Sequence, residues 1–435
     1  MTPVNIGLLG LGTVGSATAR VLTRNASDIN RRAGRRIAIQ RAVVRRLERP
    51  NPDAIPLSTD PSAVVDAEDV DIVVELLGGL EPARSLVLRA IANGKHVVTA
   101  NKALIAHHGN EIFAVARERG VVVAFEAAVA GGIPIIKAVR EALAGNRITG
   151  VAGIINGTSN YILSAMALDG QDFHTALAAA QAKGFAEADP TFDIEGIDAA
   201  HKLTILASIA FGIPLQYDRV AVEGIAAVRG EDVRYASELG YCIKHLGLAR
   251  QGETGVELRV HPTLIPKSNP LASVNGAMNA VLVDGDAVGQ TLYYGPGAGG
   301  EPTASAVVAD IVDVVRVLTA DPDHRVPHLA FQPDHLVDAP IVPLAAVETA
   351  YYLRMRALDR PGVMAEVTRI LADAHISIEA LLQKEPLPGA DDVPVVMVTH
   401  RVREGQMNQA LAHIEGLASI RGSVVRLRLE NLGAT

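Results

Sequence analysis

Cysteine is nearly absent from this sequence: Cys242 is the single thiol among 435 residues. One cysteine excludes a disulfide framework and any metal site built from several thiolates, and it fits a reducing compartment. Long apolar runs are also missing, because charged or turn-forming residues interrupt every stretch of about 18 residues, so no membrane span is expected. No basic segment precedes the first apolar run. A signal peptide is therefore not expected, and we expect a cytoplasmic protein.

An excess of positive charge is absent as well. The chain has 40 basic and 48 acidic residues and a net charge of −8, which argues against nucleic acid as the main partner, because phosphate binding needs a basic surface. Hydrophobic residues make up 49% of the chain and are spread along it, which is typical of a globular protein. The length exceeds the about 250–300 residues at which a single core stops growing, so two or three domains are expected.

The N-terminal region has the pattern of a dinucleotide-binding site. An apolar run of strand length, residues 5–10, leads into a G-x-G-x-x-G motif, and residues 16–22 have helical apolar spacing. Strand, glycine motif and helix in this order place backbone amides and a helix N-terminus at a pyrophosphate. The residues expected to bind the cofactor are Gly10, Gly12, Thr13, Val14 and Gly15. A glycine-rich turn without a ligand is the alternative.

The region that follows alternates between short apolar runs and helical stretches, which predicts a doubly wound parallel sheet. The expected strands are 37–44, 71–77, 96–100 and 121–127, with helices that include 82–92 and 103–119.

The end of the second predicted strand bears on cofactor choice. Arg45 and Arg46 stand where an acidic residue usually binds the ribose 2′-hydroxyl of NAD. An arginine would instead neutralise a 2′-phosphate, so NADP is favoured, although NAD stays possible. Two arginines on a solvated loop are the alternative.

Two lysines are candidates for the chemistry. Lys102 follows the fourth strand, at the edge of the sheet where such folds bind ligands, although a surface lysine opening a helix would look the same. Asp198 and Lys202 stand at i and i+4 of a predicted helix, 196–211, which is nearly apolar after Lys202. A lysine at the border of a core can exchange a proton with a hydroxyl or carbonyl. A structural ion pair on the helix surface is the alternative.

Taken together, these motifs resemble homoserine dehydrogenases. The matching segments are ordered, correctly spaced and spread through about the first 320 residues: 10–15, 100–102, 125–134, 156–160, 184–190, 198–203, 294–300 and 302–305.

The resemblance implies reversible, NAD(P)-dependent interconversion of L-homoserine and L-aspartate 4-semialdehyde, a step toward threonine, methionine and isoleucine. It makes Lys202 the proton donor and acceptor at the substrate oxygen. Glu187 and Asp198 would bind the amino-acid part of the substrate, and Lys102 would lie between substrate and cofactor. Further cofactor contacts are expected at Gly157, Gly297 and Gly299, of which the last two could also simply shape a turn.

The same resemblance implies a monovalent cation site, with sodium as the expected ion. Its ligands would be Glu126 and the backbone carbonyls of Val129, Gly131 and Ile133. The sequence itself shows only a carboxylate beside a glycine-proline turn, and a plain structural turn is equally compatible with it.

The C-terminal segment is predicted to be a separate module. Residues 326–345 contain four prolines, which predicts a linker. In residues 346–435 the predicted order is strand, helix, strand, strand, helix, strand, which is ferredoxin-like: 350–358, 363–374, 376–382, 393–401, 407–417 and 424–429. With its Asp359-Arg360-Pro361-Gly362 turn, this module resembles an ACT domain.

An ACT domain implies self-association and amino-acid binding. We therefore expect a homodimer or homotetramer and L-threonine as feedback inhibitor, with Asp359 and Gly362 near the effector. A module that only dimerises is the alternative. The whole chain would then comprise a Rossmann-type cofactor domain, an α+β substrate and dimerisation domain, and the ACT domain. The predicted bounds are 1–135, completed by about 295–325, then 136–294, and finally 346–435.

Two other functions are alternatives to this one. Aspartate-semialdehyde dehydrogenase needs a nucleophilic cysteine, and Cys242 lies in a strand-like run without a motif, which excludes that reaction. A catalytically inactive amino-acid-sensing protein on a dehydrogenase scaffold is the remaining alternative. Intact Glu187, Asp198 and Lys202 argue against it.

Overall fold

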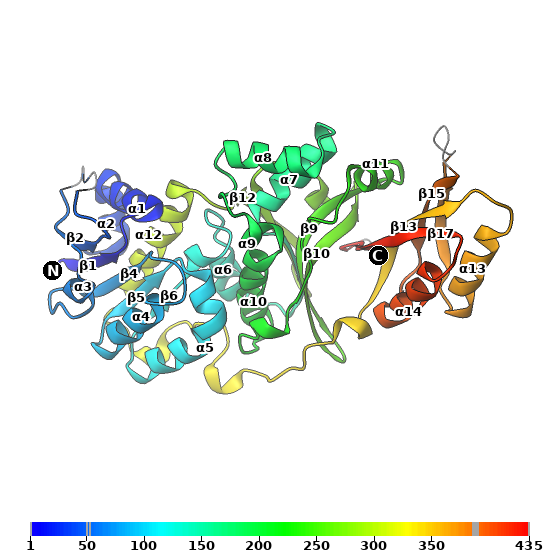
Figure 1. Cartoon of the computed structure of the whole chain (residues 1–435). Coiled ribbons are helices and arrows are strands. Elements are labelled where there is room, and N and C mark those ends of the chain that lie inside the picture. Colours follow the sequence, from blue (N-terminus) through cyan, green and yellow to red (C-terminus); the bar gives the residue numbers. More distant parts are fainter. Residues whose placement is uncertain (1, 49–50, 52–53, 385–390, 434–435) are drawn as a thin grey trace. The chain divides into compact units, whose positions relative to one another are not determined.

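The computed structural model describes residues 2–48, 51, 54–384 and 391–433 (Figure 1). Its backbone contacts divide the chain into two compact units. The first unit comprises 1–157, 197–220 and 277–339, and the second comprises 158–196, 221–276 and 340–435. No helix in the described part of the chain combines the length and apolar character needed to cross a membrane.

The first unit contains a six-stranded sheet in which all strands are parallel. Its spatial order is β3-β2-β1-β4-β5-β6, which places the first strand at the centre. From β1 the chain adds strands first on one side and then on the other, so the strand order changes direction between β1 and β4. The strands are β1 (Val4–Leu9), β2 (Ile37–Val43), β3 (Leu57–Ser58), β4 (Ile72–Glu75), β5 (His96–Thr99) and β6 (Val123–Ala124). The predicted doubly wound sheet is confirmed.

Successive strand residues point to opposite faces of the sheet, and both faces carry apolar residues. Helices therefore cover the sheet. One face packs against helices α1 (Thr13–Arg24), α2 (Ala26–Ala33) and α12 (Gly300–Val317), which share a core with β1 and β4. The helices α3 (Ser62–Val65), α4 (Ala83–Ala92) and α5 (Lys102–Glu118) connect the strands, and α4 packs against both β4 and α5. Helix α12 thus joins the core of this sheet although it begins at Gly300, far beyond the last strand at Ala124.

The glycine motif has a steric reason. A Cβ atom on Gly15 would lie 2.3 Å from the backbone carbonyl oxygen of Gly10, so a larger residue would push α1 away from the end of β1. Gly10 itself has a φ of 103°, a conformation that favours glycine. Gly12 is exposed, and no atom lies within 4 Å of the position of its missing Cβ. Its backbone is therefore open to a ligand.

The remaining elements of the first unit bring the catalytic candidates to the sheet. Helix α10 (Ile197–Phe211) is buried along nearly its whole length and packs against α5, and this confirms the predicted helix 196–211. Antiparallel strands β7 (Ile148–Ile154), β11 (Met278–Gly285) and β12 (Gly289–Pro296) lead into α12, and the short α6 (Ile135–Lys137) follows the sheet.

The second unit contains a long antiparallel hairpin and the C-terminal module. The hairpin consists of β9 (Tyr241–Gly252) and β10 (Gly255–Pro266), and the two-residue β8 (Ala221–Val222) pairs with β10. Its helices are α7 (Gly157–Leu168), α8 (Phe173–Ala182), α9 (Thr191–Ile194) and α11 (Gly230–Glu238).

The C-terminal module has the predicted ferredoxin-like order, with its strands arranged β17-β13-β15-β14. Strand β17 also pairs in parallel with β10, so the module's sheet continues into the hairpin of the same unit. The elements are β13 (Glu348–Leu358), α13 (Val363–Asp373), β14 (Ile378–Gln383), β15 (Asp392–Thr399), β16 (Val402–Arg403), α14 (Glu404–Glu415) and β17 (Ile420–Leu429).

Candidate active site

The carboxyl ends of β1, β2 and β4 surround a cleft of about 690 Å³. The fingerprint residues Gly10 and Gly12 line it on one side, and Arg45 and Arg46 line it at the end of β2. Both arginines are exposed, and neither forms an ion pair with any residue that the structure describes. The cleft therefore combines open backbone amides with two available positive charges, as an anionic dinucleotide requires.

A buried carboxylate shapes the loops beside this cleft. Glu75, the last residue of β4, accepts hydrogen bonds from the backbone N–H of Leu77 (2.8 Å) and Gly78 (3.2 Å) and from the Thr99 hydroxyl (2.6 Å). Burial raises the pKa of Glu75, and the hydrogen bonds oppose that shift. Glu75 therefore links the loops that follow β4 and β5. Glu75 was not identified from the sequence, although an acidic residue at the end of an apolar strand was a usable signal.

Asn101 and Lys102 begin helix α5 at the same edge. The Asn101 side chain accepts a hydrogen bond from the Leu104 N–H (3.1 Å) and donates one to the carbonyl of Gly79 (2.7 Å). This cap fixes the first turn of the helix. The Lys102 Nζ atom lies 3.2 Å from Oδ1 of Asp198, so Lys102 is not an isolated surface lysine.

Asp198 is the centre of a buried polar cluster. Its Oδ2 atom accepts hydrogen bonds from Nζ of Lys202 (2.6 Å) and from Nδ2 of Asn156 (2.8 Å). Lys202 also donates to the carbonyl oxygen of Ile155 (2.7 Å). The side chains of Asp198 and Lys202 are only 5% and 11% exposed, which excludes a solvated ion pair on the helix surface.

The charge of Asp198 is stabilised by its neighbours. Burial alone would raise the pKa of this carboxyl group, but Lys202 and Lys102 hold the pKa well below its usual value. Asp198 is therefore ionised at neutral pH. Asn156 and the Ile155 carbonyl complete the cluster. These two groups were not identified from the sequence, because they lie at the end of β7, more than 40 residues before Asp198 in the chain.

A second cleft, of about 280 Å³, opens onto this cluster. The structure brings together several predicted residues around it: Thr13, Val14, Lys102, Gly131, Lys202, Gly297 and Gly299. The fingerprint, both lysines and the glycine turn before α12 thus face one space. Gly157 does not line either cleft. It allows close packing instead, because a Cβ there would lie 2.8 Å from the Ala277 carbonyl oxygen.

Glu187 lies in the second unit, on the loop between α8 and α9. Its side chain is exposed, and its backbone carbonyl accepts a hydrogen bond from Gln181 Nε2 (3.0 Å). The predicted effector residues Asp359 and Gly362 also belong to this unit and lie on the exposed turn between β13 and α13. Gly362 has a φ of 94°, and no atom of the described residues lies within 4 Å of its Cβ position. The described part of the chain therefore leaves this turn accessible.

The predicted cation ligands share one buried loop. The Glu126 carboxylate accepts hydrogen bonds from the backbone N–H groups of Ile136 and Lys137, each 2.9 Å long. Burial and the nearby Asp310 raise the pKa of Glu126 to about 7. The Ile133 carbonyl accepts a hydrogen bond from Ile135 N–H (2.8 Å). The structure thus places the buried Glu126 carboxylate on the same turn as Val129, Gly131 and Ile133.

Burial shifts two further titratable side chains toward their neutral forms. His201 is buried with its Nε2 atom 3.1 Å from Nε2 of His107, and burial lowers its pKa to about 4, so it is neutral. Burial raises the pKa of the Cys242 thiol, which keeps it protonated and unreactive.

Taken together, a parallel dinucleotide-binding sheet with a buried lysine–carboxylate cluster at its ligand edge defines a nicotinamide-dependent oxidoreductase. Three family profiles match this chain. The one described as homoserine dehydrogenase matches residues 134–312, and its NAD-binding domain matches residues 10–126. The ACT domain profile matches residues 351–418.

Individual relatives agree with these profiles. A homoserine dehydrogenase of Pseudomonas aeruginosa is 62% identical, and the match covers 99% of this chain and 100% of that protein. The crystal structure of a homoserine dehydrogenase from Thiobacillus denitrificans is 64% identical with a TM-score of 0.96, covering 100% of this chain and 99% of that one. A hyperthermophilic archaeal homoserine dehydrogenase in complex with NADPH is 27% identical with a TM-score of 0.62, covering 72% of this chain and 98% of that one.

The chain belongs to the homoserine dehydrogenase family, and it carries an ACT domain at its C-terminal end. The retained lysine–aspartate cluster and the full-length similarity favour the enzyme over the inactive amino-acid sensor.

Proposed function

We propose that this protein catalyses the reversible NAD(P)H-dependent reduction of L-aspartate 4-semialdehyde to L-homoserine, in the biosynthesis of threonine, methionine and isoleucine. The observation that carries the proposal is the geometry of Lys202. Its ammonium group has three N–H donors, of which two are used by Asp198 and Ile155. The third is left for a substrate oxygen in the cleft that Lys202 lines.

The bound cofactor supplies the hydride that adds to the carbonyl carbon of the semialdehyde. As that carbon is reduced, negative charge develops on its oxygen, and Lys202 donates a proton there. In the reverse reaction, Lys202 in its neutral form accepts the hydroxyl proton. Asp198 stabilises the protonated lysine and fixes its orientation through the 2.6 Å hydrogen bond.

The remaining proposed roles concern binding. Asp198 and Glu187 bind the amino-acid end of the substrate, and Lys102 lies between substrate and cofactor. Support for Lys102 comes from its position at the cleft and its contact with Asp198. Gly297 and Gly299 line the same cleft and would let the chain approach the cofactor closely. Gly157 supports the start of α7.

NADP is the proposed cofactor. Arg45 would pair with its 2′-phosphate, because Arg45 lines the dinucleotide cleft without an ion-pair partner among the described residues. The archaeal relative that binds NADPH supports this choice. A sodium ion held by Glu126, Val129, Gly131 and Ile133 would offset the cost of ionising the buried Glu126 carboxylate.

The ACT domain, residues 346–435, is proposed to mediate feedback inhibition by L-threonine in a cytoplasmic homodimer or homotetramer. The accessible turn at Asp359 and Gly362 supports an effector contact there. The cofactor domain (1–135 and 295–325) and the substrate domain (136–294) would then respond to it through the intervening segment 326–345.

The first prediction concerns the proton donor. Replacing Lys202 by alanine removes the only proposed proton route, so kcat with aspartate semialdehyde should fall by at least about 10³-fold. NADPH binding does not depend on this proton. The Kd of NADPH, measured by fluorescence titration, should therefore stay within about twofold of the wild-type value. Turnover close to that of the wild type would remove Lys202 from the mechanism.

The second prediction concerns cofactor choice. In Arg45→Ala, the KM for NADPH should rise about tenfold or more, because a charge-assisted hydrogen bond to the 2′-phosphate is lost. The KM for NADH in the same variant is the internal control and should not change. A wild-type enzyme that clearly prefers NADH would contradict the assignment.

The third prediction concerns the cation. The pKa of Glu126 is raised to about 7 in the folded protein, above its value of about 4.3 in an unfolded chain. The folded state therefore binds more protons between these values, and stability without sodium should fall as pH rises through this window. Sodium should raise Tm more at pH 8 than at pH 6, and Glu126→Gln should abolish the sodium effect. Equal Tm values with and without sodium at pH 8 would rule the site out.

The fourth prediction concerns regulation. L-threonine should slow turnover of the full chain, and Asp359→Ala should weaken that inhibition while leaving kcat without threonine unchanged, because the turn is remote in sequence from the catalytic helix. Calorimetry and initial rates measure binding and inhibition separately. If threonine neither binds nor inhibits the wild type, the effector proposal is wrong.

A further inference from the structure

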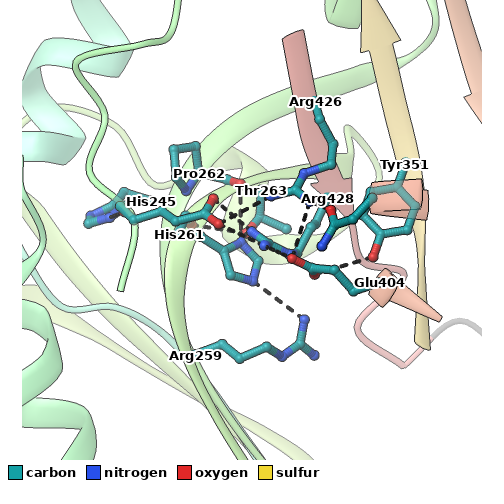
Figure 2. Close-up of polar contacts among 11 residues, drawn as sticks. His245, Arg259, His261, Pro262, Thr263, Tyr351, Glu404, Arg426 and Arg428 are labelled. Carbon is teal, nitrogen blue, oxygen red and sulfur yellow. Dashed lines mark hydrogen bonds and ion pairs between the residues drawn. The ribbon is translucent and has the colours of Figure 1, made fainter. Parts of the chain in front are cut away.

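An ion cluster around one buried arginine of the second unit joins the ACT domain to the loop after β8. At its centre is Arg428 on β17, which is only 1% exposed. Its guanidinium donates to the Glu404 carboxylate (2.7 and 2.5 Å) and to the Glu223 carboxylate (2.8 and 2.7 Å). Figure 2 shows the Glu404 side, where Tyr351 contacts the same carboxylate. One arginine thus binds one glutamate inside the ACT domain and one outside it.

The charges of this cluster hold each other in place. Arg426 also approaches both carboxylates, at 3.4 Å from Glu223 and 3.3 Å from Glu404, so two arginines face two glutamates. Burial alone would raise the pKa of Glu223, but hydrogen bonding and charge from Arg428 hold it below its usual value. Arg428 is buried, whereas the Glu223 side chain is 40% exposed. Glu223 is therefore fixed in place by its two hydrogen bonds from Arg428, and not by burial of its charge.

The backbone around Glu223 is fixed just as firmly. Its N–H donates to the carbonyl of Val260 (2.7 Å), and its carbonyl accepts from Nε2 of His245 (3.0 Å). Two residues further on, the N–H of Ile225 donates to the carbonyl of Ile194 (2.8 Å). The loop after β8 is therefore attached both to the hairpin and to the end of helix α9.

Two glycines bring this loop into direct backbone contact with the segment after α9. A Cβ on Gly224 would lie 2.4 Å from the Ile194 carbonyl oxygen and 2.8 Å from Cα of Glu195. A Cβ on Gly196 would lie 3.0 Å from a Val222 methyl group and 3.1 Å from the His245 ring. No space separates the two segments, so a displacement of the loop that carries Glu223 must displace residues 194–196.

The segment 184–196 is the one that carries Glu187, and Gly196 is bonded directly to Ile197, the first residue of helix α10. Asp198 is the next residue along that helix. We propose that Arg428 and Glu223 are positioning residues for the amino-acid end of the substrate. Arg428 anchors Glu223, Glu223 fixes the loop after β8, and that loop fixes the segment that presents Glu187 and leads into Asp198. The inference rests on the proposed substrate roles of Glu187 and Asp198.

This arrangement gives the ACT domain a direct influence on substrate binding. The last strand of the domain supplies the arginine, so a change in the position of β17 alters the Glu223 anchor. The nucleotide cleft is built by the N-terminal sheet and contains none of these residues. Loss of the anchor should therefore affect the affinity for the semialdehyde and leave the cofactor affinity unchanged.

The test replaces Glu223, because Arg428 then keeps Glu404 as a partner and no buried charge is left alone. In Glu223→Ala, the KM for aspartate semialdehyde should rise about tenfold or more, since small misplacements of binding groups have large effects. The Kd of NADPH should stay within about twofold, and Glu223→Gln should give an intermediate KM. The matched control is Glu348→Ala, which breaks an exposed ion pair of the ACT domain with Arg403 and should leave both constants unchanged.

The outcomes separate positioning from a merely structural role. An unchanged KM for the semialdehyde in folded Glu223→Ala would overturn the inference, and so would an equal weakening of both substrates with a lowered Tm. If Glu223→Ala does not fold, Arg428→Lys decides, because an ammonium group cannot hold both carboxylates by paired hydrogen bonds. A raised KM for the semialdehyde alone supports the inference, and an unchanged one overturns it. Asp198→Asn, assayed in parallel, tests the substrate site itself. An unchanged KM for the semialdehyde in Asp198→Asn counts against the proposed site. A raised KM in Asp198→Asn together with an unchanged KM in Glu223→Ala counts against the positioning role alone.

Discussion

The catalytic site depends on one buried carboxylate, Asp198, and on the lysines that keep it charged. An ionised carboxylate in a protein interior is costly unless nearby charges and hydrogen bonds compensate it. Lys202, Lys102 and Asn156 supply that compensation from helix α10, from helix α5 and from the end of β7. These three elements must therefore meet at one point for the charge to be tolerated. The same contacts that stabilise Asp198 also fix the direction of the Lys202 ammonium group.

The fold of the first unit brings these three elements together. Parallel strands end at one edge of the sheet, so the fingerprint glycines, Glu75 and the start of α5 all lie there. Helix α10 is nearly apolar beyond Lys202 and is buried against α5, which places its polar first turn at the same edge. The glycine turn before α12 lines the catalytic cleft. Thr13 and Val14 of the fingerprint and the proposed proton donor Lys202 thus line the same cleft.

Local patterns in the sequence predicted much of this. Apolar runs located the strands, the glycine motif located the cofactor edge, and the i, i+4 spacing identified Asp198 and Lys202 as a pair. The spacing could not decide between surface and core, since burial depends on what packs over the helix. Asn156, the Ile155 carbonyl and Glu75 were missed for a related reason, because their roles arise only when separate loops meet. The link between Glu223 and Arg428 spans 205 residues and leaves no local signature at all.

The central claim is that Lys202 transfers the proton, and chemical rescue tests it most directly. Small primary amines added to Lys202→Ala can enter the space left by the side chain beside the catalytic cleft. Turnover of aspartate semialdehyde should rise with amine concentration. Rates across a series of protonated amines should fall as amine basicity rises, because a more acidic ammonium group donates its proton more readily. A variant that still binds NADPH but shows no response to any amine would contradict the central claim.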